Sequence, residues 1–186
     1  MKLRLISVFV SVFLIRVPAY SSVTEFTNKN AWQSAAGSFT TITFQEVPVG
    51  TVVTDQYDFL GIQFTPGQVA ESSIYVNDNV GLVNGVPISF TFDQPRQSVA
   101  FDYPGSLQIK LFSAGELIYT SSIFGVGGLG FFAGISSTQS FDTVMFSHGF
   151  GPPADVDDLH FGATVPAPAS AILLIGLAAC GRRRRR

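Results

Sequence analysis

The 186-residue chain has few of the residues that form covalent cross-links or common catalytic sites. Its one cysteine, Cys180, lies near the C-terminus, so the rest of the chain can form no disulfide and must be held by core packing or a metal. Only two histidines occur, His148 and His160, without a G-x-S-x-G elbow or an H-E-x-x-H helix. We therefore expect surface histidines, no catalytic residues and a protein that is not an enzyme.

Basic residues are scarce away from the two ends of the chain. Of the eleven, only Lys29, Arg96 and Lys110 lie between residues 20 and 164, the segment that holds all thirteen acidic residues. This segment therefore has a net charge of −10. An acidic domain repels polyphosphate and attracts cations, so we expect no nucleic-acid partner and consider a divalent metal.

Residues 1–19 have the pattern of a secretory signal peptide. Basic Lys2 and Arg4 precede an apolar run over 5–15, and the small-residue exit Val17-Pro18-Ala19 follows. We predict export by the Sec route with cleavage after Ala19. Residues 20–164 are then long enough to bury the core of one domain.

Residues 165–186 combine a Pro-x-Pro spacer, a short apolar stretch and a terminal run of five arginines. As a helix, the apolar stretch over 169–181 reaches about 20 Å, against a bilayer core of about 30 Å. Arginines that extend into the head groups narrow this gap and favour a cytoplasmic C-terminus. We predict a C-terminal transmembrane helix that anchors the chain.

This tail resembles the PEP-CTERM sorting signal of proteins that exosortases process in Gram-negative bacteria. In that family the helix anchors a precursor in the inner membrane until cleavage near a Pro-Glu-Pro motif releases the protein to the cell surface or matrix. The resemblance implies an exosortase-like partner and a sorting motif at Val165, Pro166 and Pro168. Ala167 replaces the family's usual glutamate.

The central segment has short apolar or alternating runs separated by Gly, Pro, Asn and Asp, a pattern typical of antiparallel β structure. The expected strands are 42–44, 61–64, 86–92, 97–103, 107–112, 116–119, 131–136, 143–147 and 156–161. A Gly-bearing turn at 113–115 is expected to join two of them in a hairpin. One short helix is expected over Lys29–Ala36, capped by Asn28 and ended by Gly37, with Trp32 packed on one end of the sandwich.

Phenylalanine is abundant, with eighteen residues, many of them at alternate strand positions. Because burial of a ring removes a large apolar area from water, we expect most of them in the core. Tyrosines are expected to be exposed and are the better candidates for a face that stacks on sugars. These are Tyr57, Tyr75, Tyr103 and Tyr119.

Taken in order, the segments also resemble a domain that recurs in PEP-CTERM proteins and is similar to bacterial jelly-roll lectins and carbohydrate-binding modules. Its most specific motif matches Val53-Thr54-Asp55-Gln56-Tyr57 followed by Gly61-Ile62-Gln63-Phe64. The other matches are 26–36, 43–46, 90–95, 99–102, 131–136 and 155–161. The resemblance implies an all-β, antiparallel jelly-roll β-sandwich with one short N-terminal helix.

In similar jelly rolls, a carboxylate on the first strand and an aspartate entering the last strand hold calcium and tie the chain ends together. The matching residues are Glu46 and Asp157, so the resemblance implies one structural Ca²⁺. Strand alternation points Asp157 inward with Leu159, and His160 towards water. An inward carboxylate needs a cation or donors, and backbone amides at a turn are an equally good alternative.

Together these features predict an exported surface or extracellular-matrix protein whose non-catalytic sandwich binds polysaccharide or another matrix component. One alternative is a structural or adhesive protein that contacts other proteins. A further alternative is a polysaccharide hydrolase, which would need two carboxylates or a histidine–carboxylate pair at working distance.

Overall fold

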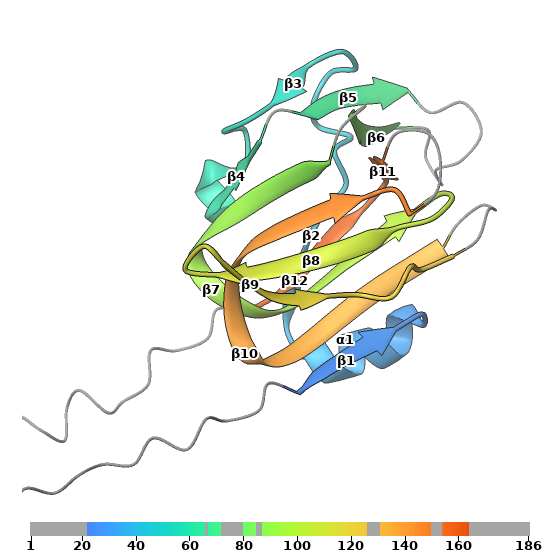
Figure 1. Ribbon diagram of the computed structural model, residues 1–186. Coiled ribbons are helices and arrows are strands. Elements are labelled where there is room, and N and C mark those ends of the chain that lie inside the picture. Colours follow the sequence, from blue (N-terminus) through green and yellow to red (C-terminus); the bar gives the residue numbers. More distant parts are fainter. Residues whose placement is uncertain are drawn as a thin grey trace, which may run out of the picture.

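The computed structural model describes residues 22–65, 67–71, 80–84, 87–125, 131–149 and 154–163 (Figure 1). These residues form mostly antiparallel β-sheet with one short α-helix. The expected signal peptide and the tail with Val165, Pro166 and Pro168 lie outside them, as does Tyr75. Within the described part of the chain, no helix is long and apolar enough to cross a bilayer.

The elements follow one another in this order: β1 (Val23–Phe26), α1 (Lys29–Ala36), β2 (Phe39–Ile42), β3 (Val52–Val53), the 3₁₀-helix η1 (Asp58–Leu60), β4 (Ile62–Phe64), β5 (Gly67–Glu71), β6 (Val80–Asn84), β7 (Ile88–Tyr103), β8 (Gln108–Ser113), β9 (Glu116–Thr120), β10 (Phe131–Ser147), β11 (Ala154–Val156) and β12 (Leu159–Gly162). The larger sheet has the order β2-β12-β7-β10-β8-β9, with β1 on β10 and β4 on β7. A smaller sheet, β11-β6-β5-β3, lies at the top of Figure 1.

Helix α1 has the bounds and caps that the sequence predicts. The Asn28 side chain accepts a hydrogen bond from the Ala31 N–H at 3.0 Å, which satisfies a donor left free at the helix start. Gly37 ends the helix at φ 72°, and its N–H donates to the Gln33 carbonyl. The predicted hairpin is also confirmed, because β8 pairs with β9 across a turn at Ala114 and Gly115.

Strands β7 and β10 are long, and each changes its core-facing side partway along. In β7, Phe90 and Phe92 face the core in the first half, whereas Val99 and Phe101 face it in the second. The inward positions thus change from even to odd numbers. The register of β10 on β7 is also broken on both sides of Phe141. Such bulges let a strand bend from one layer into another.

The two halves of β7 therefore have different neighbours. The first half pairs with β4 and the second with β12, and β10 is paired with both. Rings of each half pack on those of neighbouring strands. The centroid of Phe101, in the second half, is 5.0 Å from that of Phe146 on β10, and the centroid of Phe92, in the first half, is 5.4 Å from that of Phe161 on β12. This packing gives the fold its β-sandwich-like core, and most of the phenylalanines that the structure describes are buried in it as expected.

Two expectations about aromatic residues are wrong. Tyr57 and Tyr103 are buried, because the first packs its ring on Phe44 and Phe64 and the second shares the inward face of β7 with Phe101. Trp32 packs on the outer face of the larger sheet rather than on the end of the sandwich, in a second cluster with Ala100 and Phe132. That cluster also includes the partly buried Phe26 and Ala36.

Candidate functional site

Helix α1 packs on the outer face of the larger sheet, against β7 and β10. Trp32 is fully buried there, and its indole N–H donates to the Ile135 carbonyl at 3.2 Å. The ring centroid of His160 lies 6.0 Å from that of Trp32 and 6.1 Å from that of Phe39. This aromatic cover leaves His160 only 2% exposed, although it projects from the sheet face opposite the main core.

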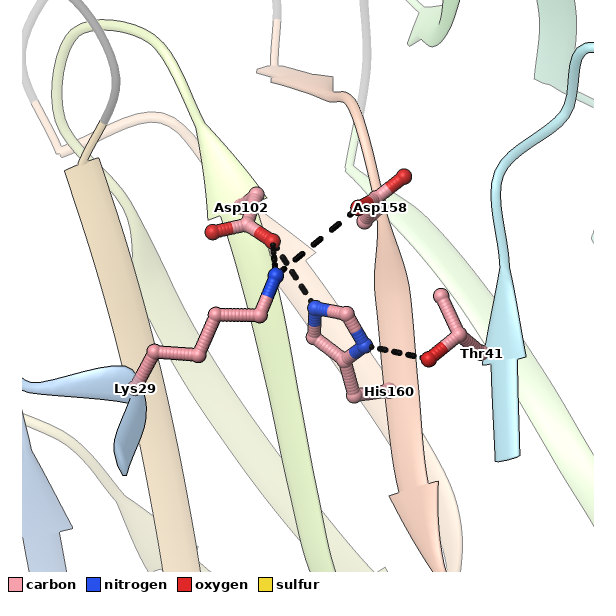
Figure 2. Close-up of polar contacts among 5 residues, drawn as sticks. All are labelled: Lys29, Thr41, Asp102, Asp158 and His160. Atoms are coloured by element: carbon pink, nitrogen blue, oxygen red, sulfur yellow. Dashed lines mark hydrogen bonds and ion pairs between the residues drawn. The ribbon is translucent and has the colours of Figure 1, made fainter. Parts of the chain in front are cut away.

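Three adjacent strands, β2, β12 and β7, align Thr41, His160 and Asp102 in one row (Figure 2). Thr41 and His160 are direct cross-strand partners, with 2.8 Å between Oγ1 and Nδ1. The other ring nitrogen, Nε2, lies 2.8 Å from Asp102 Oδ2. Because Ala100 is the register partner of His160, Asp102 is its diagonal neighbour on the same face. The row joins a hydroxyl, an imidazole and a carboxylate.

Lys29, the first residue of α1, brings a cation to the same carboxylate. Its Nζ lies 2.5 Å from Asp102 Oδ2 and 3.9 Å from Asp158 Oδ2 (Figure 2). The Asp102 N–H also donates to the Asp158 carbonyl at 2.9 Å, so the two aspartates are held together by the backbone. The first turn of α1 is therefore tied to β7 and to the start of β12 by charge as well as by packing.

The environment of Asp102 favours its charged form. Burial by itself raises the pKa of this carboxyl, but hydrogen bonds from His160 and Lys29 and their attraction for the anion more than offset burial. The pKa of Asp102 consequently lies below its usual range. The site holds a stable anion at neutral pH.

Asp102, Asp158 and His160 also form a group that could hold a metal ion. One ligand atom from each residue lies within 4.8 Å of the others. Across the described ranges, this is the one group of three or more His, Cys, Asp or Glu side chains with that geometry. Sequence reasoning missed it because Asp102 lies on β7, far along the chain from Asp158 and His160.

The predicted calcium ligands lie elsewhere. Asp157 is 3% exposed and so is buried as predicted, but it lies in the turn between β11 and β12 rather than on a strand. Its N–H donates to the Asp102 carbonyl at 2.8 Å. Glu46 is exposed in the turn after β2 rather than on a strand, and the Thr43 hydroxyl donates to it at 3.4 Å. Calcium at this pair stays a prediction.

The expectation of surface histidines is wrong. Strand alternation correctly places His160 opposite the face of Leu159 and Phe161, but α1 covers that second face as well. His148 is half-buried, with its Nδ1 3.1 Å from Ser106 Oγ. A helix that carries a tryptophan needs an apolar surface to cover, and that signal could have indicated a buried outer face.

A row of hydroxyl, imidazole and carboxylate can pass a proton from Thr41 to His160. However, Lys29 shares the oxygen of Asp102 that would stabilise the resulting imidazolium, and the histidine is closed off from solvent. The geometry thus suits a fixed polar network or a cation site better than covalent catalysis. No protein-family model matches this chain, and the search of curated proteins found no match.

Proposed function

We propose that this protein is an exported surface or extracellular-matrix component whose sandwich domain binds polysaccharide and catalyses no reaction. In this proposal the domain is a jelly roll of the kind associated with PEP-CTERM proteins. The chain is exported by the Sec route and held in the inner membrane by residues 165–186. An exosortase-like enzyme then processes it at Val165, Pro166 and Pro168.

The observation that supports polysaccharide binding is the exposure of Phe59. Its side chain is 79% exposed on η1, which is unusual because most of the phenylalanines that the structure describes are buried. The side chains of Asp55 and Asp58 are exposed on the same short segment. A ring of this kind can stack on the apolar face of a sugar, while carboxylates accept hydrogen bonds from sugar hydroxyls.

The segment that carries Phe59 is firmly attached to the core. The neighbouring Tyr57 is buried, with its ring centroid 5.7 Å from that of Phe44 and 6.4 Å from that of Phe59. Gly61 ends η1 at φ 72°, a left-handed conformation that favours glycine. A ring held on a fixed turn loses little conformational entropy when a ligand binds.

Two features of the row formed by Thr41, His160 and Asp102 support a non-catalytic role. His160 is covered by α1 and so has no access to a polymer. Asp102, the carboxylate beside it, is paired with Lys29. Neither group is placed as a general acid or base for a glycosidic bond, which must reach the substrate directly.

A glycan array followed by calorimetry on the purified protein tests the proposal. We expect a polysaccharide ligand whose affinity falls by at least about tenfold in Phe59→Ala, as for other exposed aromatic anchors. Leu117→Ala is the matched control, because Leu117 is 54% exposed on β9, outside this segment, and should leave affinity unchanged. An array without any glycan ligand, or equal losses in both variants, would contradict the proposal.

The sorting proposal has a separate test. Mass spectrometry of protein recovered outside the cell should show a C-terminus near Pro166 to Pro168. An extracellular chain that still ends at Arg186 would rule out processing at this motif.

A further inference from the structure

We propose that Asp102, Asp158 and His160 bind one divalent transition-metal ion such as Zn²⁺, and that the Lys29 ammonium takes the cation position when no metal is bound. The inference does not rest on polysaccharide binding. It also differs from the calcium site predicted at Glu46 and Asp157, because it uses an imidazole nitrogen and different carboxylates.

The ligand atoms are already close to the spacing that a metal needs. Bonds of about 2 Å in a tetrahedral site place ligand atoms roughly 3 Å apart. His160 Nε2 and Asp102 Oδ2 are 2.8 Å apart, and the whole set lies within 4.8 Å. The remaining movement falls on Asp158, which is partly exposed and follows the turn between β11 and β12. A change of its side-chain rotamer can supply that movement.

The position of Lys29 is an independent sign that this place accepts a cation. Its Nζ lies beside both aspartates, yet one ammonium leaves the two carboxylates with a net charge of −1. A divalent ion would balance them fully. Because the Lys29 side chain is 39% exposed, it can turn into solvent when a metal arrives. The acidic domain raises the local concentration of cations as well.

Thr41 allows His160 to change its role without losing a hydrogen bond. Beside Lys29, a proton on Nε2 is donated to Asp102, and Nδ1 accepts from the Thr41 hydroxyl. With a metal on Nε2, the ring proton moves to Nδ1, which then donates to Thr41 Oγ1. A histidine that binds metal usually has its second nitrogen held in this way.

The ligand set determines the kind of metal. An imidazole with two carboxylates suits Zn²⁺ or Co²⁺, whereas Ca²⁺ prefers six to eight oxygen ligands. Three protein ligands leave a further coordination position for water. The bound ion would connect β7 to β12 and release the first turn of α1 from its ion pair with Asp102.

Calorimetry with zinc chloride tests the site in the full chain that carries Cys180→Ser, since a free thiol is a competing zinc ligand. We expect one ion per chain. Lys29→Met removes the competing ammonium and should raise the affinity for zinc by about tenfold or more. Asp158→Asn should lower that affinity by about the same factor. Asp93→Asn, at an exposed position on β7, is the control and should leave zinc affinity unchanged.

Two spectroscopic measurements distinguish this site from adventitious binding. Cobalt should give the visible absorption of a low-coordinate site, and zinc should shift the ¹⁵N signals of the His160 ring but not those of His148. A stoichiometric zinc site that is insensitive to Asp158→Asn would overturn the proposal. So would the absence of binding in both the parent chain and Lys29→Met, whatever the result of the glycan experiments.

Discussion

Gly134 on β10 lies directly against the indole ring of Trp32 from α1. A Cβ atom at position 134 would be 2.5 Å from Trp32 Cδ1 and 2.8 Å from Cγ. The indole has little room to retreat, because its ring packs on those of Phe39 and Phe132 at centroid distances of 5.5 and 6.0 Å. The absent side chain is what lets the helix approach the sheet and cover His160.

Gly134→Ala should lower the free energy of unfolding by about 1–3 kcal/mol, the usual cost of overpacking a close contact. Urea denaturation measures the loss. Gln139→Ala, at an exposed position of the same strand, should change stability by less than about 0.5 kcal/mol. A second variant, Trp32→Leu with Gly134→Ala, should show non-additive losses because the two residues touch. Additive losses would mean that the clash is relieved elsewhere.

Ala114→Asn should stabilise the β8–β9 hairpin by about 0.5–1 kcal/mol. Ala114 and Gly115 both have positive φ, at 51° and 81°, the pattern of a type I′ turn in which Asn-Gly is the preferred pair. The bond from the Ala114 N–H to Asp142 Oδ2 at 2.7 Å uses only the backbone of residue 114 and is retained. Compared with the parent chain, thermal melts should show a higher Tm for Ala114→Asn and a lower Tm for Ala114→Val. The opposite order would contradict a left-handed turn.

Stability should fall in acid as Asp102 becomes protonated. Since the folded pKa of this carboxyl is lowered, the unfolded chain binds a proton more readily, and unfolding is favoured as pH decreases. Asp102 makes its full contribution to the free energy of unfolding above the pKa it has in the unfolded chain, near 4. This contribution is lost as the pH falls through the lower pKa of the folded state. Between about pH 6 and pH 2, the free energy of unfolding measured by denaturation should depend less on pH in Asp102→Asn than in the parent chain. An unchanged slope would exclude this carboxyl as a source of acid sensitivity.

Chelation should lower the Tm if calcium binds at Glu46 and Asp157. Asp157→Asn should reduce that effect, because it removes a charged ligand from a buried position. Added Ca²⁺ should restore the Tm after chelation, and the restoration should be smaller in Asp157→Asn, which distinguishes this site from that of His160. A Tm that does not respond to chelation, in the parent chain and the variant alike, would favour backbone amides as the partners of Asp157.

Features that depend on neighbouring residues could be predicted without the structure. The caps of α1 at Asn28 and Gly37 and the turn at Ala114 and Gly115 are local, because their hydrogen bonds and φ angles involve residues only a few positions apart. The burial of alternate phenylalanines also follows from strand periodicity. Local geometry and apolar area are sufficient causes for all of these.

Features that depend on distant contacts could not be predicted in this way. Alternation places His160 on the second face of its strand, but only the packing of Trp32 over Gly134 decides that this face is closed to water. The contact of Lys29 with Asp102 joins residues 73 positions apart, and that of Thr41 with His160 joins residues 119 apart. Which strands lie side by side is settled by the packing of the whole chain, and that choice brings one lysine, two aspartates and one histidine into a single site.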